Sequence, residues 1–273
     1  MMLRLLTFVS VLFAFSCVKD KPPVAAKSDV QLAPGARVYV VNEGNFYGNN
    51  ASVSLYDPAS AQVVADYYGS RNNSALGDVA QSITMVNGQY HIVVNNSGKI
   101  VVCDNEFRKL NEYHGFSSPR YLLPVSNRKA YVSDYNANAI SVLDLNSGQR
   151  ETVIPCAGWT EKMVKIYHKV FVTNMKRPFL YVINSIDDKI TDSIEVGKGA
   201  GNIVTDRFDK VWLLVSGEGG SSDKAQLLRI DPVTNAIETS FEFPAGQSPG
   251  SLCMNRGLDT LYYLNAGVFR LPV

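Results

Sequence analysis

The chain has 273 residues, 46% of them hydrophobic, so it is long enough to bury a sizeable core. Its 26 basic and 25 acidic residues leave a formal net charge of +1, and no stripe of lysine and arginine is interleaved with aromatic residues. This balance argues against nucleic acid as a partner, because the protein has no basic field to attract a polyanion.

Residues 1–17 have the features of a lipoprotein signal peptide. Arg4 precedes the apolar run LLTFVSVLFAFS, which is too short to span a bilayer, and Cys17 directly follows the small Ser16. This arrangement resembles the lipobox of bacterial lipoproteins, in which the cysteine is lipidated and becomes the mature N-terminus. The alternative is an ordinary signal peptide beside which Cys17 is incidental. We expect Cys17 to carry a lipid anchor.

Residues 18–36 predict a flexible tether. The segment VKDKPPVAAKSDVQLAPGA is rich in proline and alanine, carries charges of both signs and has no hydrophobic periodicity. The polar residues directly after Cys17 resemble the export signal of Bacteroidetes surface lipoproteins. That resemblance implies an outer-membrane protein, held by its lipid and displayed at the cell surface; an anchor that faces the periplasm is the alternative.

From residue 37 to residue 273 the sequence repeats a unit of short strands. In the clearest unit, 129–154, two apolar runs flank a polar turn and Asn146-Ser147-Gly148 leads into a third strand, while a further strand at 119–123 precedes them. The pattern recurs at a spacing of about 40 residues, as in four-stranded propeller blades. Equivalent strands are centred on Val40, Val93, Val132, Val172, Leu213 and Tyr263. We predict one all-β domain, a β-propeller, over residues 37–273.

Two segments make the repeat similar to a known family. VFVTN at 170–174 and SVLDLNSG at 141–148 resemble the YVTN-repeat β-propellers of bacteria. The resemblance covers the chain from Arg37 onwards and implies the fold; it implies little about activity, since propellers host unrelated functions.

The two ends of the repeat region differ from the units between them. Residues 37–68 supply strands equivalent to the second, third and fourth of a blade, and 268–273 correspond to a third strand. Completing a closed seven-bladed ring would take roughly 60 more residues at this period. We therefore expect about six units of a seven-bladed ring with a truncated C-terminus. An intact six-bladed or open arrangement, with exposed edge strands, is the alternative.

One face of such a propeller collects the irregular loops, which join second to third strands and blade to blade. Aromatic rings and amides gathered there suit a planar or amide-bearing ligand, because rings give contact area at little entropic cost and amides both donate and accept hydrogen bonds. The simpler explanation for any single Asn is a turn residue. We predict that ligand-binding residues are Asn45, Phe46, Tyr47, Asn96, Tyr135, Asn136 and Trp159.

The sequence offers little for catalysis or for a metal. It contains no HExxH, GxSxG or phosphate-binding loop. His91, His114 and His168 fall in a strand, at a strand end and in a turn of the opposite face, so we expect neither a catalytic nor a metal-binding role and no cofactor. Cys103, Cys156 and Cys253 fall in strands and are expected to be buried small hydrophobic residues, with a bridge such as Cys103 to Cys156 as the alternative.

The opening VYVVNEGNFYGNNASVSLYDP resembles the start of surface propeller lipoproteins of Bacteroidetes. Some of these bind cobalamin and pass it to a TonB-dependent outer-membrane transporter. The resemblance implies a non-catalytic lipoprotein that captures a small-molecule nutrient, with a corrinoid as the candidate, for such a transporter, and that meets the membrane through its lipid alone. The alternatives are a propeller lyase or lactonase and a scaffold for envelope proteins.

The lipid anchor can be tested directly. Cys17→Ser should release the protein from the membrane fraction, because the substitution removes the thiol that carries the lipid and the apolar run before it is too short to span a bilayer. Cell fractionation and immunoblotting measure the change, with Cys253→Ser as the matched control. A Cys17→Ser protein that stays in the membrane fraction contradicts the assignment.

Overall fold

A computed structural model of the chain describes residues 37–217 and 224–273. The predicted signal peptide, Cys17 and the tether lie outside the described residues. Within them the chain forms strands and one short helix. In chain order these are β1 (Val38–Asn42), β2 (Ser52–Asp57), β3 (Gln62–Val64), α1 (Tyr67–Asn72), β4 (Ala80–Val86), β5 (Gln89–Val94), β6 (Lys99–Cys103), β7 (Lys109–His114), β8 (Pro119–Pro124), β9 (Lys129–Asp134), β10 (Ala139–Asp144), β11 (Arg150–Pro155), β12 (Thr160–Ile166), β13 (Lys169–Asn174), β14 (Phe179–Asn184), β15 (Lys189–Glu195), β16 (Ala200–Thr205), β17 (Val211–Val215), β18 (Gln226–Ile230), β19 (Ile237–Glu242), β20 (Gly250–Met254), β21 (Thr260–Leu264) and β22 (Val268–Pro272).

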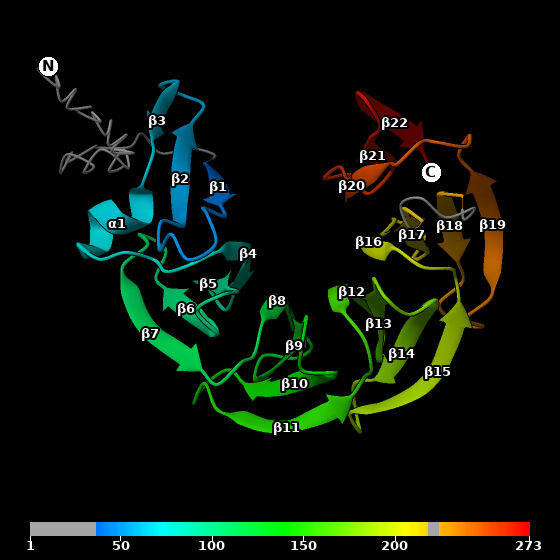
Figure 1. The fold of residues 1–273 in the computed structure, drawn as a ribbon, viewed down its shortest axis with the longest axis horizontal. Coiled ribbons are helices and arrows are strands. Elements are labelled where there is room, and N and C mark those ends of the chain that lie inside the picture. Colours follow the sequence, from blue (N-terminus) through cyan, green and yellow to red (C-terminus); the bar gives the residue numbers. More distant parts are fainter. Residues whose placement is uncertain (1–36, 218–223) are drawn as a thin grey trace, which may run out of the picture.

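The strands form six antiparallel sheets in which each strand pairs with its neighbours in the sequence. The four middle sheets, β4–β7, β8–β11, β12–β15 and β16–β19, have four strands each, and the first and last, β1–β3 and β20–β22, have three. The sheets are arranged one after another around an arc, with β7, β11, β15 and β19 on its outer side (Figure 1). The prediction of an all-β propeller with about six units is confirmed.

Apolar side chains from neighbouring sheets pack against each other to form the core. Along a strand successive side chains point to opposite faces, so one strand contributes to the cores on both sides of its sheet. In β5, Ile92 and Val94 pack with Val53 and Leu55 of the first sheet, whereas Val93 packs against the third sheet. Three further interfaces along the arc repeat this pattern among the described residues.

The first unit departs from its predicted strands near its end. The sequence predicted strand structure through Tyr68, but β3 ends at Val64 and Tyr67 begins the helix α1. Asp66 caps this helix, since its carboxylate accepts a hydrogen bond from the Gly69 amide at 2.9 Å. Tyr67 and Tyr68 are buried in the core between the first two sheets, so the helix covers apolar surface there.

The cysteines in the described residues are free thiols, so the alternative bridge between Cys103 and Cys156 is wrong. Cys103 and Cys156 are buried, as the sequence predicted. The predicted burial of Cys253 is wrong: it is exposed, because it lies opposite Tyr262 on the face of the last sheet that has no neighbouring sheet. Burial raises the pKa of the Cys103 and Cys156 thiols to about 12, because a thiolate would lose its hydration there. These two side chains act as small apolar residues of the core.

The first and last sheets face each other across an opening in the arc (Figure 1). Each presents apolar side chains on the side that lacks a neighbouring sheet: Val38 and Val40 on β1, and Leu264 and Val268 on β21 and β22, are exposed. Strands β1 and β22 are also the outermost members of their sheets, so each has one unpaired edge. Such edges and faces favour association with other chains.

We therefore expect the chain to associate as its concentration rises and to unfold over a broad temperature range. The double variant Val40→Lys and Val268→Lys should reduce association, since lysine on an exposed sheet disfavours sheet-to-sheet contact. Ile186→Lys, an exposed position in the turn between β14 and β15, is the control. Sedimentation velocity and calorimetry measure the two effects. A sharp, reversible transition of a monomeric wild-type protein contradicts the expectation.

One buried histidine links stability to pH. His91 is 2% exposed, lies beside the Tyr113 ring at 6.1 Å between centroids, and neither of its ring nitrogens makes a hydrogen bond of ordinary geometry. Burial lowers the pKa of His91 below its usual 6.5, because a charged imidazole would lose its hydration in this core.

The unfolded chain consequently binds more protons than the folded chain below about pH 6.5, so stability falls as the pH decreases through that range. His91→Leu should flatten the loss of stability between about pH 6.5 and pH 5. His168→Gln, in the exposed turn between β12 and β13, should keep the wild-type slope. Urea unfolding across this pH range measures the slopes, and equal slopes for His91→Leu and wild type contradict the assignment.

Candidate functional site

The irregular loops gather on one face of the arc, which we call the loop face. It consists of segments 43–51, 95–98, 135–138, 175–178 and 265–267 within sheets, together with 115–118, 156–159, 196–199 and 243–249 between sheets. Backbone hydrogen bonds join the two sets: Tyr135 donates to Ser118 at 2.9 Å, and Met175 donates to Trp159 at 2.9 Å. The loops predicted to share a face therefore lie against one another.

Tyr135 and Trp159 form the centre of the loop face. Tyr135 lies between β9 and β10 of the third sheet and Trp159 in the connection from that sheet to the fourth, and their rings meet edge to face with centroids 4.0 Å apart. Both side chains are half-buried. Lys176 Nζ lies 5.7 Å from the Tyr135 ring centroid, and the Arg120 guanidinium lies 5.9 Å from that of Trp159. The pair thus combines aromatic surface with two cations at its margin.

Phe46 and Tyr47 make a second aromatic group on the first sheet. They are 65% and 89% exposed, with centroids 6.3 Å apart. Asp78 holds this loop to the next sheet, because its Oδ2 accepts from the Tyr47 amide at 2.8 Å and from the Asn96 side chain at 2.6 Å. The backbone amide of Asn45 donates to Asn50 Oδ1 at 2.8 Å.

The predicted site residues therefore fall into two groups. Tyr47 and Asn96 both donate to Asp78, and Asn45 and Phe46 precede Tyr47 in the same loop. Tyr135 and Trp159 pack together. Asn136 is exposed in the turn after β9, where its amide nitrogen donates to Asp134 at 2.8 Å. The Asn96 side-chain amide already donates a hydrogen bond to Asp78. A ligand that accepts from this amide would therefore compete with Asp78 for the donor.

The sequence did not reveal the polar groups on the inner strands. A β-bulge interrupts β4, β8, β12, β16 and β20 close to the loop face, where the pairing register shifts. A bulge inserts an extra residue and re-aims side chains. We use the term bulge cluster for the side chains that these positions bring together, namely Gln81, Arg120, Tyr121, Glu161, Lys162 and Asn202.

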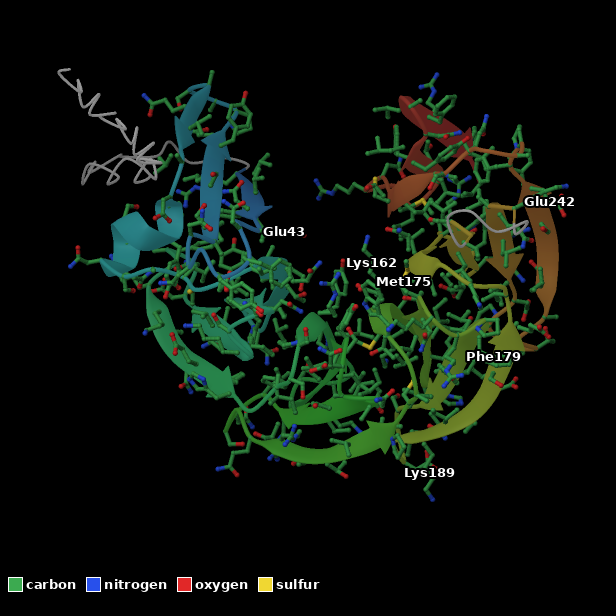
Figure 2. The ribbon with its side chains drawn as sticks, viewed as in Figure 1. Glu43, Lys162, Met175, Phe179, Lys189 and Glu242 are labelled. Carbon is green, nitrogen blue, oxygen red and sulfur yellow. The ribbon has the colours of Figure 1, made fainter. Side chains whose placement is uncertain are left out.

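Contacts between neighbouring inner strands connect the bulge cluster. Arg120 Nε donates to Glu161 Oε1 at 2.8 Å, and Lys162 Nζ donates to Asn202 Oδ1 at 2.8 Å. Glu161 Oε1 also accepts from the Trp159 indole nitrogen at 2.5 Å, which joins the cluster to the aromatic pair. Lys162 and Met175 lie on the inner side of the arc, as does Glu43, whereas Lys189 and Glu242 lie on its outer side (Figure 2).

Burial disfavours ionisation at the centre of this cluster. Glu161 is 5% exposed, and its pKa is raised by desolvation, against which the Arg120 charge and hydrogen bond act. Desolvation likewise lowers the pKa of Lys162, opposed by the charge of Glu161. A repeat-based signal could have found part of the cluster, because the second residue of β4, β8 and β12 is polar, at Gln81, Arg120 and Glu161.

The described residues hold no group of three or more His, Cys, Asp or Glu side chains placed to bind a metal ion. Within the same ranges, no helix is both long and apolar enough to cross a bilayer. Glu43 is exposed at the end of β1.

Comparison with protein families gives one match, over residues 36–268, to the family described as "Domain of unknown function (DUF5074)". The chain belongs to this family. The DUF5074 match spans the first five sheets, β20 and β21 of the sixth, and both groups of predicted site residues. A comparison with curated proteins found no match.

Solved structures similar to this DUF5074 domain share its fold at low sequence identity. Hydrazine synthase of Kuenenia stuttgartiensis matches with a TM-score of 0.61 and 14% identity over 68% of this chain and 55% of that one. The dihydro-heme d1 dehydrogenase NirN in complex with DHE matches at 0.59 and 16%, over 82% and 50%. A Bacteroides caccae protein of unknown function matches at 0.59 and 10%, over 83% and 82%.

The DUF5074 chain thus spans about half the length of the first two of these structures. At such identities the likeness establishes the propeller fold alone. Two of the three names denote enzymes and one denotes no function, so the neighbours do not separate catalysis from binding.

Proposed function

We propose that this protein is a non-catalytic binding lipoprotein that captures a nutrient ligand on its loop face. The candidate ligand is cobalamin or a related corrinoid, and the recipient is a TonB-dependent outer-membrane transporter. The observation that supports this proposal best is the packed Tyr135–Trp159 pair, in which two half-buried rings meet at 4.0 Å between neighbouring loops.

The aromatic pair suits a large, flat ligand with a polar fringe. The Tyr135 and Trp159 rings are fixed against each other, so a ligand gains apolar contact without ordering mobile side chains. Exposed amide side chains can bond the fringe, and Asn136 stands next to Tyr135 in the same turn. Asn45 is exposed on the first sheet beside the exposed ring of Phe46.

The second aromatic group would extend the same surface. Phe46 and Tyr47 are the most exposed rings at this face, and an exposed apolar ring favours contact with a partner. Asp78 fixes the Tyr47 backbone to the second sheet, so the loop that carries both rings has a defined position. A transporter surface or the outer part of the ligand would fit these rings.

The place of the protein in the cell rests on the N-terminal residues. A lipid on Cys17 and the tether of residues 18–36 would hold the propeller beside the outer membrane, at the cell surface, within reach of a transporter. The transporter is proposed because the opening sequence, VYVVNEGNFYGNNASVSLYDP, resembles that of surface propeller lipoproteins.

Titration calorimetry of the protein lacking residues 1–17 against cobalamin and cobinamide tests the proposal. Trp159→Ala and Tyr135→Ala should each weaken binding by about 2 kcal/mol or more, roughly thirtyfold in affinity, because each removes a central ring. Asn136→Ala should cost less, since an exposed amide at the rim keeps its water.

Phe208→Ala is the matched control. Phe208 is an exposed ring that also lies under a cation, with the Arg207 guanidinium 4.9 Å from its centroid, but its turn between β16 and β17 is on the opposite face. This variant should bind like the wild type. No heat with either corrinoid removes that ligand class, and binding that survives both ring substitutions removes the proposed face.

A further inference from the structure

Lys162 lacks the carboxylate partner that several lysines of similar burial have; in the described residues Lys169 likewise bonds neutral oxygens, those of Pro232, Val233 and Asn235. Lys99, Lys129 and Lys210 each form an ion pair with a carboxylate within the described residues. Lys162 forms no such pair there. Its Nζ donates to the neutral Asn202 Oδ1 at 2.8 Å and lies 5.9 Å from the Tyr121 ring centroid. A half-buried ammonium without a carboxylate keeps a strong attraction for an anion.

Arg120 has unused donors in the same cluster. Its Nε bonds Glu161, but its two terminal Nη groups make no hydrogen bond within the part of the chain that the structure describes. The Arg120 side chain keeps 19% of its surface accessible. Because a guanidinium can bind a carboxylate or a phosphate through two parallel hydrogen bonds, these groups are suited to an anionic ligand group.

The charge within the bulge cluster also favours an anion. Arg120 and Lys162 bring two positive charges to the bulge cluster, against the carboxylate of Glu161 within it. Glu43, exposed on the same inner side, is a second carboxylate nearby, and its charge acts on Tyr121. The Glu161 carboxylate is shared between Arg120 and the Trp159 indole, which both donate to its Oε1. The side-chain nitrogen of Asn202 stays available as a further donor while Oδ1 accepts from Lys162.

We propose that Lys162, Arg120 and Asn202 form a binding site for a carboxylate or phosphate group on the inner side of the arc, next to the aromatic pair. This inference deepens the proposed function and depends on it only in assigning the anionic group to the captured nutrient: the flat part of the ligand lies on Tyr135 and Trp159, and its anionic group reaches inward to Lys162. Glu161 Oε1 accepts hydrogen bonds from both Arg120 and Trp159, so the anion site and the aromatic pair lie side by side.

Small anions test the site without the full ligand. Inorganic phosphate and succinate are titrated into the protein at constant ionic strength with chloride, and the amide succinamide serves as the uncharged counterpart of succinate. Calorimetry should detect binding of at least one anion and none of succinamide. The tighter of the two anions distinguishes a phosphate site from a carboxylate site.

Substitutions at Lys162 locate the binding. Lys162→Gln should weaken anion affinity at least tenfold, and Lys162→Arg should restore most of it, since the charge returns. Lys189→Gln, on the outer side of the arc, is the control and should bind like the wild type (Figure 2). Circular dichroism and thermal unfolding confirm that each variant is folded; a Lys162→Gln variant that fails to fold is replaced by Asn202→Ala, for which the same loss is expected.

Three results overturn the site: no heat with either anion, equal affinities for Lys162→Gln and wild type, or equal binding of succinate and succinamide. The outcome is separable from that of the proposed function. Anion binding that depends on Lys162 without any corrinoid binding supports the site and rejects the corrinoid. If the protein binds neither anion and Lys162→Gln leaves corrinoid binding unchanged, the result supports the loop face and rejects this site.

Discussion

The packing of one sheet against the next is the interaction on which this structure depends. A single sheet of four short strands cannot bury its own faces, so each sheet depends on the neighbouring sheets to cover them. Strand β5 shows how this works, since its alternate side chains enter the cores on either side. The first and last sheets have such a neighbour on one side, and exposed valines and leucines mark the other side of each.

The same constraint places the candidate site. Because the middle strands of each sheet are committed to packing, variation is left to the loops and to the ends of the inner strands. The β-bulges at these ends turn polar side chains toward the inside of the arc without breaking the cores behind them. Tyr135 and Trp159 stand directly beyond the bulges, and Glu161 connects the two levels through its bonds to Trp159 and Arg120.

The sequence predicted the features that depend on periodicity and missed those that depend on contacts between sheets. A spacing of about 40 residues and period-two alternation were enough for the sheets, their order and the common face of the loops. They could not show that Tyr135 packs on Trp159, because that contact joins a loop within the third sheet to the connection that leads to the fourth. They also could not show the bulges, which change the register by one residue and leave the alternation of the flanking strand intact. The early end of β3 has a local cause, since Asp66 caps the helix α1 that follows the strand.

The energetics of the bulge cluster argue that it serves binding more than stability. A buried ion pair such as Arg120 with Glu161 gains little net stability, since desolvation offsets the attraction, and apolar residues in these positions would hold the sheets together at least as well. The stability argument is stronger for Lys162, because its ammonium group loses hydration on folding and has an amide oxygen, not a carboxylate, as its hydrogen-bond partner. Elsewhere in the same protein a lysine of similar burial has its carboxylate, as Lys129 has Asp188 at 2.7 Å. Lys162 thus stands next to fixed aromatic rings without a carboxylate partner. An anionic group of a ligand would supply that partner, and the attraction between the two charges would add to the binding free energy.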